Sequence, residues 1–211
     1  MNAPPNAVRV AVIYYSATGN VYELAGAVAS GAESEGAEVR LRRVQELAPP
    51  DAIDRNPAWR AHLDATWSIP VVAHDDLRWA DAYALGTPTR FGNVASQLKQ
   101  FLDTTGPLWA EGVFSDKVVT AFTSAGNPHG GNESTLLALY NTAYHWGSVI
   151  VPPGIAATSV PQGGGNPYGT AHPSLAGPPT AQVLSAAQQQ GRRLAATARR
   201  LCARHDEREA A

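Results

Sequence analysis

The sequence contains one cysteine, two lysines and few charged residues of either sign. Cys202 has no second cysteine for a disulfide within the chain or for a metal site. Only 16% of the 211 residues are charged, against about 25% in an average soluble protein. The formal net charge is −2, and no cluster of Lys and Arg marks a nucleic-acid-binding surface. We therefore expect no metal site and no nucleic acid partner, and the lack of disulfides is typical of the cytoplasm.

Long apolar runs are also missing. The apolar run at 8–15 is interrupted by Arg9 and is far too short to cross a bilayer. The residues before it do not show the charged and then apolar pattern of an export signal. We therefore expect no export and no membrane insertion.

Charge is absent altogether from Ser134 to Gly191. Glycines and prolines interrupt this stretch too often for a membrane helix. Buried segments read as continuous apolar runs, so one interpretation is a buried helix, a buried strand and a stiff loop. A second interpretation adds that the loop lies at a subunit interface or over a ligand. Because Trp146, Tyr168 and the many prolines cannot all fit inside one domain, we expect a homo-oligomer.

Strand-like and helix-like segments alternate along the rest of the chain. β-branched and alternating runs predict strands at 8–15, 37–44, 80–86, 117–124 and 149–151. Apolar residues at helical spacing predict helices at 21–36, 94–102, 132–145 and 180–203. Residues 45–76 contain four prolines and no clear period, which predicts a long connection with one helical turn near 57–65.

This alternation predicts an α/β fold with a doubly wound, five-stranded parallel sheet and helices on both faces. No internal repeat or change in composition divides the chain. We therefore expect a single domain over 1–211, with flexible tails at 1–6 and 204–211. The strand at 37–44 is half polar, which places it near an edge of the sheet.

Three loops rich in glycine and small polar residues follow the first, third and fourth expected strands, at 16–20, 87–93 and 124–131. Ligands bind to such sheets beyond the carboxyl ends of the strands, where the strand order reverses. The first loop enters a helix, and its Ser16, Thr18 and Asn20 provide short hydrogen-bonding side chains. Without a Walker or dinucleotide motif, it suits a single terminal phosphate. The alternative is an N-capped turn without a ligand.

The order of several motifs is similar to that of the WrbA family of FMN-dependent NAD(P)H:quinone oxidoreductases. These motifs are 8–20, GTPTRFGN at 86–93, FLDTTGPLWAEG at 101–112, HWGSVIVPPG at 145–154 and GGGNPYG at 163–169. The resemblance covers nearly the whole chain. It implies a flavodoxin-like fold, FMN, NADH or NADPH as electron donor, a quinone as acceptor, and a dimer or tetramer.

The resemblance also implies site residues. Those that would hold the FMN phosphate are Ser16, Ala17, Thr18, Gly19, Asn20 and Val21. Those that would hold the ring and ribityl chain are Pro88, Thr89, Arg90, Phe91, Gly92, Asn93, Ser124, Ala125, Gly126, Asn127 and Gly130. His145 would reach the flavin as a catalytic group, and Trp109 and Thr18 would lie at the substrate site.

Two positions depart from the family pattern, and other interpretations stay open. Thr18 stands where the family often has an aromatic residue, and the loop containing His129 is one residue longer than usual. Taken alone, His145 is typical of a helix end that donates to a carbonyl, and Trp109 of a core residue. The chain could also be a one-electron carrier of the flavodoxin type or a regulatory protein that retains the fold. The low net charge disfavours the carrier, which needs a strong field for docking.

Overall fold

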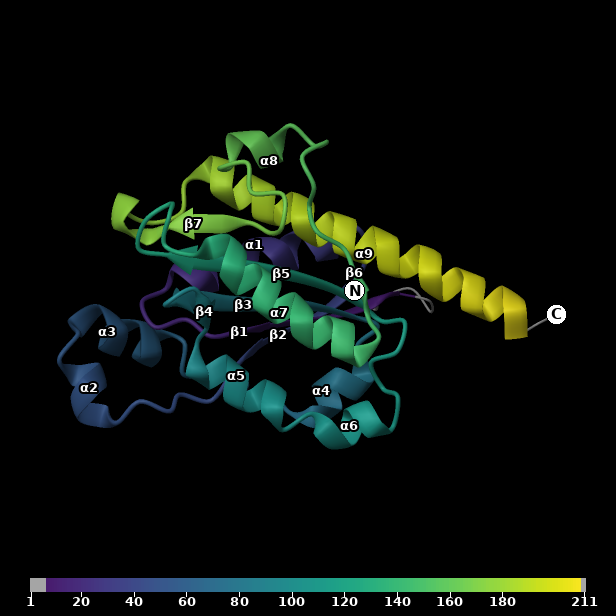
Figure 1. The fold of residues 1–211 in the computed structure, drawn as a ribbon, viewed down its shortest axis with the longest axis horizontal. Helices are drawn as coiled ribbons and strands as arrows, with labels where there is room; N and C mark the ends of the chain where they lie inside the picture. Colours follow the sequence, from purple (N-terminus) through teal and green to yellow (C-terminus); the bar gives the residue numbers. More distant parts are fainter. Residues whose placement is uncertain (1–6, 210–211) are drawn as a thin grey trace.

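The computed structural model of the protein describes the backbone of residues 7–209 and the side chains of residues 7–203. A parallel sheet runs through the molecule with helices on both faces (Figure 1), which confirms the expected α/β fold. Its strands are β1 (Arg9–Tyr14), β2 (Glu38–Arg43), β3 (Ala82–Arg90), β5 (Val118–Ala125) and β6 (Val149–Ile150). They lie in the order β2-β1-β3-β5-β6. The chain therefore reverses direction across the sheet between β1 and β3, and β2 occupies the expected edge.

Two short strands extend the sheet. β4 (Asn93–Val94) pairs with the end of β3 in an antiparallel hairpin, which makes β3 longer than the expected 80–86. β7 (Ala171–Pro173) pairs with the end of β5, whereas β6 pairs with its beginning. One edge of the sheet is thus shared by two strands that are separated by the loop at 151–170.

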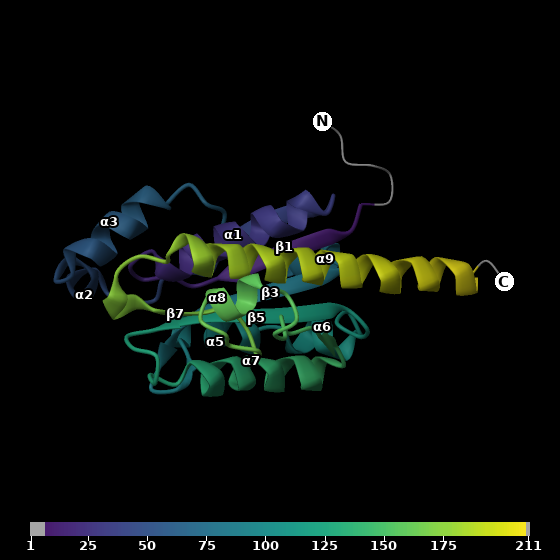
Figure 2. The same ribbon diagram turned by 90° about the horizontal axis from the view of Figure 1, so that it is seen from above.

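The helices form two layers. Figure 2 shows α1 and α9 on one side of the sheet and α5, α6 and α7 on the other. The longest helices are α1 (Asn20–Ser34), α7 (Asn132–Trp146) and α9 (Ala181–Glu209). Shorter ones are α2 (Pro50–Asp54), α3 (Pro57–Ala65), α4 (His74–Trp79), α5 (Ser96–Asp103), α6 (Gly106–Ala110), α8 (Ser159–Gln162) and the 3-10 turn η1 (Ser174–Ala176). Alternate residues of β1 face the two layers: Val10 and Val12 pack toward α1 and α9, and Ala11 and Ile13 toward α5 and α7.

Some boundaries differ from the sequence-based expectation. Residues 45–76 hold α2, α3 and the start of α4 rather than one helical turn. The last helix continues to Glu209, so residues 204–209, expected as part of a tail, are helical. The rest of the expected tails, 1–6 and 210–211, lies outside the described residues. Among the described helices, none combines the length and the apolar character that a membrane span requires.

Helices α1 and α9 approach closely through two glycines. A Cβ on Gly191 would lie 2.0 Å from the Val28 carbonyl oxygen, and one on Gly31 would lie 2.0 Å from the Gln188 carbonyl oxygen. Both obstacles are backbone atoms, which cannot rotate away.

We therefore expect Gly191→Ala to lower the free energy of unfolding by about 2 kcal/mol, because the helices must separate. Gly26→Ala is the matched control on α1. A Cβ there meets nothing within 4 Å, and alanine is the better helix former by up to about 1 kcal/mol. Urea denaturation of both variants checks the prediction, and equal stability would contradict the close packing.

Candidate functional site

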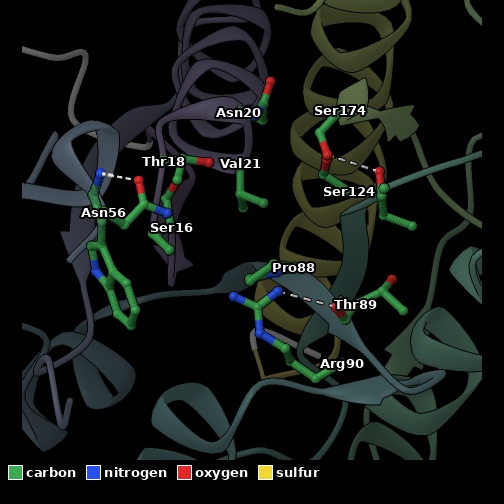
Figure 3. Close-up of a pocket in the computed structure, with 14 residues that line it drawn as sticks. Ser16, Thr18, Asn20, Val21, Asn56, Pro88, Thr89, Arg90, Ser124 and Ser174 are labelled. Carbon is green, nitrogen blue, oxygen red and sulfur yellow. Dashed lines mark hydrogen bonds between the residues drawn. The ribbon is translucent and has the colours of Figure 1, made fainter. Parts of the chain in front are cut away.

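A cavity of about 260 Å³ lies at the carboxyl ends of β1, β3 and β5 (Figure 3). Its lining includes eleven of the residues singled out in the sequence: Ser16, Ala17, Thr18, Asn20, Val21, Pro88, Thr89, Arg90, Ser124, Ala125 and Gly126. All three expected loops therefore contribute to it. This is the point at which the strand order reverses, where sheets of this kind bind ligands.

The loop after β1 leaves the N-terminus of α1 available to a ligand. Gly19 adopts a positive φ of 102° and is the N-cap residue, without a side-chain cap. Its N–H donates to the Ser16 Oγ at 3.1 Å, and its carbonyl accepts from the Glu23 N–H at 3.0 Å. The first N–H groups of a helix have no acceptor within the helix. Since no side-chain cap is present here, these N–H groups are available to a ligand.

The groups around this helix end suit a phosphate. The Ser16 and Thr18 hydroxyls, the Asn20 amide and the helix N-terminus all lie at the cavity, and a helix N-terminus favours negative charge. None of the fourteen described lining residues carries a carboxylate. The residues present therefore fit the phosphate end of FMN.

The middle of the cavity is formed by the end of β3. The Arg90 guanidinium donates to the Thr89 carbonyl at 3.2 Å, and Figure 3 shows it next to Pro88. Behind it, the hydroxyls of Thr89 and Thr123 lie 3.2 Å apart. Arg90 is the one charged residue among the fourteen that line the cavity. A positive charge at this position stabilises a ligand that gains electrons and therefore negative charge.

The far wall combines β5 with the uncharged stretch. The Ser124 hydroxyl donates to the His172 carbonyl at 2.9 Å, and the Ser174 hydroxyl donates to the Ala125 carbonyl at 3.1 Å. These contacts place Ser174 at the cavity. Part of the uncharged stretch therefore lies beside the candidate ligand site in the same chain, as one of the two sequence interpretations proposed.

Several expected residues shape the loops without lining the cavity. Phe91 and Gly92 form the turn between β3 and β4 with φ values of 50° and 73°, and the Phe91 ring is fully exposed. Asn93 donates its amide to the Phe91 carbonyl at 3.2 Å. The Asn127 side chain accepts from the His129 N–H at 3.0 Å, and its carbonyl accepts from the Gly130 N–H at 3.1 Å.

Two expected residues, Trp109 and His145, lie at the opposite end of the molecule from this cavity. The indole N–H of Trp109 donates to the His145 carbonyl at 2.7 Å. His145 lies near the C-terminus of α7, which has 15 residues and spans roughly 22 Å. The chain then enters β6, which pairs with the beginning of β5. Figure 1 likewise shows α6 and the end of α7 far from α3. Trp109 is 55% exposed, so the interpretation of Trp109 as a core residue is wrong.

Helix α3 adds two residues to the cavity that the sequence did not indicate, Asn56 and Trp59. The Asn56 Oδ1 accepts from the Trp59 N–H at 3.3 Å (Figure 3), and Pro57 occupies the first turn. Asn followed by Pro is a recognisable helix start. That signal predicts the helix, but it carries no information about which part of the fold the helix covers.

Behind Trp59, the Glu46 carboxylate collects several hydrogen bonds. Its Oε2 accepts from the Trp59 indole N–H and the Tyr15 hydroxyl, both at 3.0 Å. Its Oε1 accepts from Gln97 at 3.0 Å and from the N–H groups of Leu47 and Ala48. Burial raises the pKa of Glu46, but the hydrogen bonds outweigh burial and hold the pKa below its usual value. Glu46 is therefore an ionised acceptor that fixes the groups around it.

Nothing in the described part of the chain suggests a metal centre, because no group of three or more His, Cys, Asp or Glu residues is placed to hold an ion. The candidate site consists of hydroxyls, amides, one guanidinium and backbone groups. Such a site can bind and orient a cofactor and its substrates, and it contains no arrangement of nucleophile and base.

Comparison with known proteins places the chain among flavin proteins. Residues 8–162 match the family model of NADPH-dependent FMN reductases. A NAD(P)H dehydrogenase (quinone) of Deinococcus radiodurans is 46% identical over 169 residues, which cover 80% of this chain and 83% of the relative. Another from Archaeoglobus fulgidus is 40% identical over 194 residues, which cover 92% of this chain and 99% of the relative.

Solved structures share the architecture. A WrbA-like flavodoxin from Agrobacterium tumefaciens superposes with a TM-score of 0.67 at 25% identity, and the match covers 92% of this chain and 99% of that one. An archaeal flavodoxin has a TM-score of 0.61 at 18% identity, with 90% of this chain and 99% of that one covered. The second likeness concerns the fold alone.

Proposed function

The chain belongs to the NADPH-dependent FMN reductase family, and on that premise we propose that it is an FMN-dependent oxidoreductase that transfers two electrons from NADH or NADPH to a quinone. The observation that carries the proposal is the cavity in which an uncapped helix N-terminus, short hydroxyls and one guanidinium meet. The reaction is supported by the relatives, which are named NAD(P)H dehydrogenase (quinone).

In this proposal the chain binds and orients FMN and the substrates, and the cofactor supplies the redox chemistry. When bound, FMN would supply the transfer of a hydride from the nicotinamide and of two electrons to the quinone. Ser16, Thr18 and Asn20, with the N-terminus of α1, hold the phosphate. Pro88, Thr89 and Arg90 hold the ring from the β3 side, and the Arg90 charge favours the electron-rich reduced ring. The Ser124–Gly126 backbone holds it from the β5 side.

We further propose that Trp109 and His145 serve the cavity of a neighbouring copy. In one chain they lie at the opposite end of the molecule from the cavity, near exposed apolar side chains of α7. Leu137 and Tyr144, seven residues apart on one helix face, are 45% and 67% exposed. Apolar patches of this kind mark interfaces, and two-fold dimers and dihedral tetramers are the commonest assemblies. The assembly would be cytoplasmic, with no nucleic acid partner and no membrane insertion.

The absorption spectrum of the purified protein and its NADH and NADPH oxidation, each measured with and without benzoquinone, test the function. We expect a yellow protein whose oxidation of one or both nucleotides depends on the quinone. A yellow protein without quinone-dependent turnover would instead identify a carrier. A colourless protein that does not take up added FMN would favour the regulatory alternative.

A further inference from the structure

The candidate cavity contains one aromatic side chain among its fourteen lining residues, and that residue is Trp59. The other lining side chains are small, aliphatic or polar. Thr18, at the phosphate loop, offers a hydroxyl and a methyl group rather than a ring. Any planar ring that enters this cavity therefore has a single aromatic surface of the described chain to stack on.

Trp59 is held from two sides. Its backbone N–H donates to the Asn56 side chain at 3.3 Å, and its indole N–H donates to the Glu46 Oε2 at 3.0 Å. The half-buried ring also packs against the core layer under α5 and α7. An aromatic side chain fixed in this way loses little conformational entropy when a ligand contacts it.

Glu46 in turn is held by elements that do not include α3. Tyr15, at the end of β1, and Gln97, on α5, both donate to the carboxylate, and Gln97 also donates to the Tyr15 hydroxyl at 3.0 Å. Burial and the adjacent Glu46 raise the pKa of the Tyr15 hydroxyl, so it stays protonated and continues to donate. The network therefore ties the Trp59 indole to the end of β1 and the start of α5.

We propose that Trp59 is a specificity-determining residue that stacks on a planar redox ring in this cavity, and that Glu46 is the positioning residue that sets the angle of the indole. The inference rests on the proposed function, because that function brings planar rings to the cavity. Isoalloxazine, nicotinamide and benzoquinone are all flat π systems. Beyond the effect of burial, a stacked or edge-on aromatic pair increases affinity by a factor of about two to ten.

The experiment compares Trp59→Leu, Trp59→Phe and Glu46→Gln with the native protein. Leucine removes the π surface, phenylalanine keeps a ring without the N–H donor, and glutamine offers one acceptor oxygen where the carboxylate offers two. Trp67→Leu is the matched control, because Trp67 lies on the same connection and is 67% exposed, and it does not line the cavity. Thermal denaturation of each variant verifies that it is folded.

Two readouts distinguish the rings. FMN titration of the apoprotein, followed by quenching of flavin fluorescence, reports contact with the isoalloxazine. The KM and kcat for NADH and for benzoquinone report contact with either substrate. We expect Trp59→Leu to lower the FMN affinity, or to raise the KM for one substrate, by about threefold to tenfold. Trp59→Phe should change the same quantity less. Glu46→Gln should change the flavin quenching or that KM, with kcat nearly unchanged.

The inference is overturned if Trp59→Leu and Trp67→Leu give the same FMN affinity, the same flavin quenching and the same KM for both substrates. Failure of the proposed function looks different, because the native protein would then show no quinone-dependent turnover. In that case the FMN titration and the quenching still decide whether Trp59 contacts a ring.

Discussion

Replacing Ser16 and Thr18 together by alanine is expected to remove most of the preference of the protein for FMN over riboflavin. The two flavins differ only in the phosphate, and both hydroxyls line the cavity beside the uncapped N-terminus of α1. Hydrogen bonds to a charged group contribute about 1.5–3 kcal/mol each. Loss of two such bonds corresponds to a decrease in FMN affinity of about 100-fold or more. Riboflavin affinity should change little.

Fluorescence titration of the apoprotein with each flavin measures both affinities. Ser174→Ala is the matched control, since this hydroxyl lies on the other side of the cavity and donates to the Ala125 carbonyl. The control should retain the preference for FMN. If the native protein bound both flavins equally, the loop at 16–20 would be only a turn.

A second large effect is expected from a charge on the exposed face of α7. We predict that the native protein is a dimer or tetramer and that Tyr144→Asp dissociates it. Tyr144 is 67% exposed in a stretch without charges, and tyrosines often dominate the binding energy of interfaces. A carboxylate buried without a partner carries a large desolvation cost. Because Trp109 and His145 lie on the same side of the molecule, the loss of assembly should also lower the retention of FMN.

Light scattering and the ratio of flavin to protein measure both effects in the same sample. Tyr168→Asp, in the loop at 151–170, should act in the same direction, since Tyr168 is 41% exposed. Arg200→Asp, on an exposed part of α9, is the control and should leave the mass unchanged. A native mass of about 22.2 kDa at micromolar concentration, with flavin bound and quinone turnover intact, would contradict the prediction.

The sequence by itself determined the order of strands and helices and most of the candidate cavity. β-branched runs and helical spacing are local patterns, and each of the five expected strands has a counterpart in the sheet. The carboxyl ends of parallel strands share one edge, so loops that are far apart in the sequence had to meet there. For the same reason eleven expected residues line one cavity. The family resemblance seen in the motifs is confirmed by the family match.

Some glycines in the loop motifs are needed for close packing rather than for a ligand. Gly86 opens the motif GTPTRFGN, yet a Cβ there would lie 2.3 Å from the Phe122 ring, so this glycine is required by packing between neighbouring strands. Gly131 likewise approaches Gly92, where a Cβ would lie 2.7 Å from the Gly92 Cα. From sequence alone, a glycine needed for close packing looks the same as a glycine needed for a ligand.

Only the tertiary structure decided which irregular segments cover the cavity. Trp59 reaches it because Glu46, Tyr15 and Gln97, from three separate parts of the chain, form one hydrogen-bond network. Ser174 reaches it because β7 pairs with the end of β5. Trp109 and His145 lie at the opposite end of the molecule because α7 runs back along the sheet. Helices and strands can be predicted because periodic burial produces a pattern in neighbouring residues. Contacts between distant, irregular segments produce no such pattern, so only the folded chain determines those contacts.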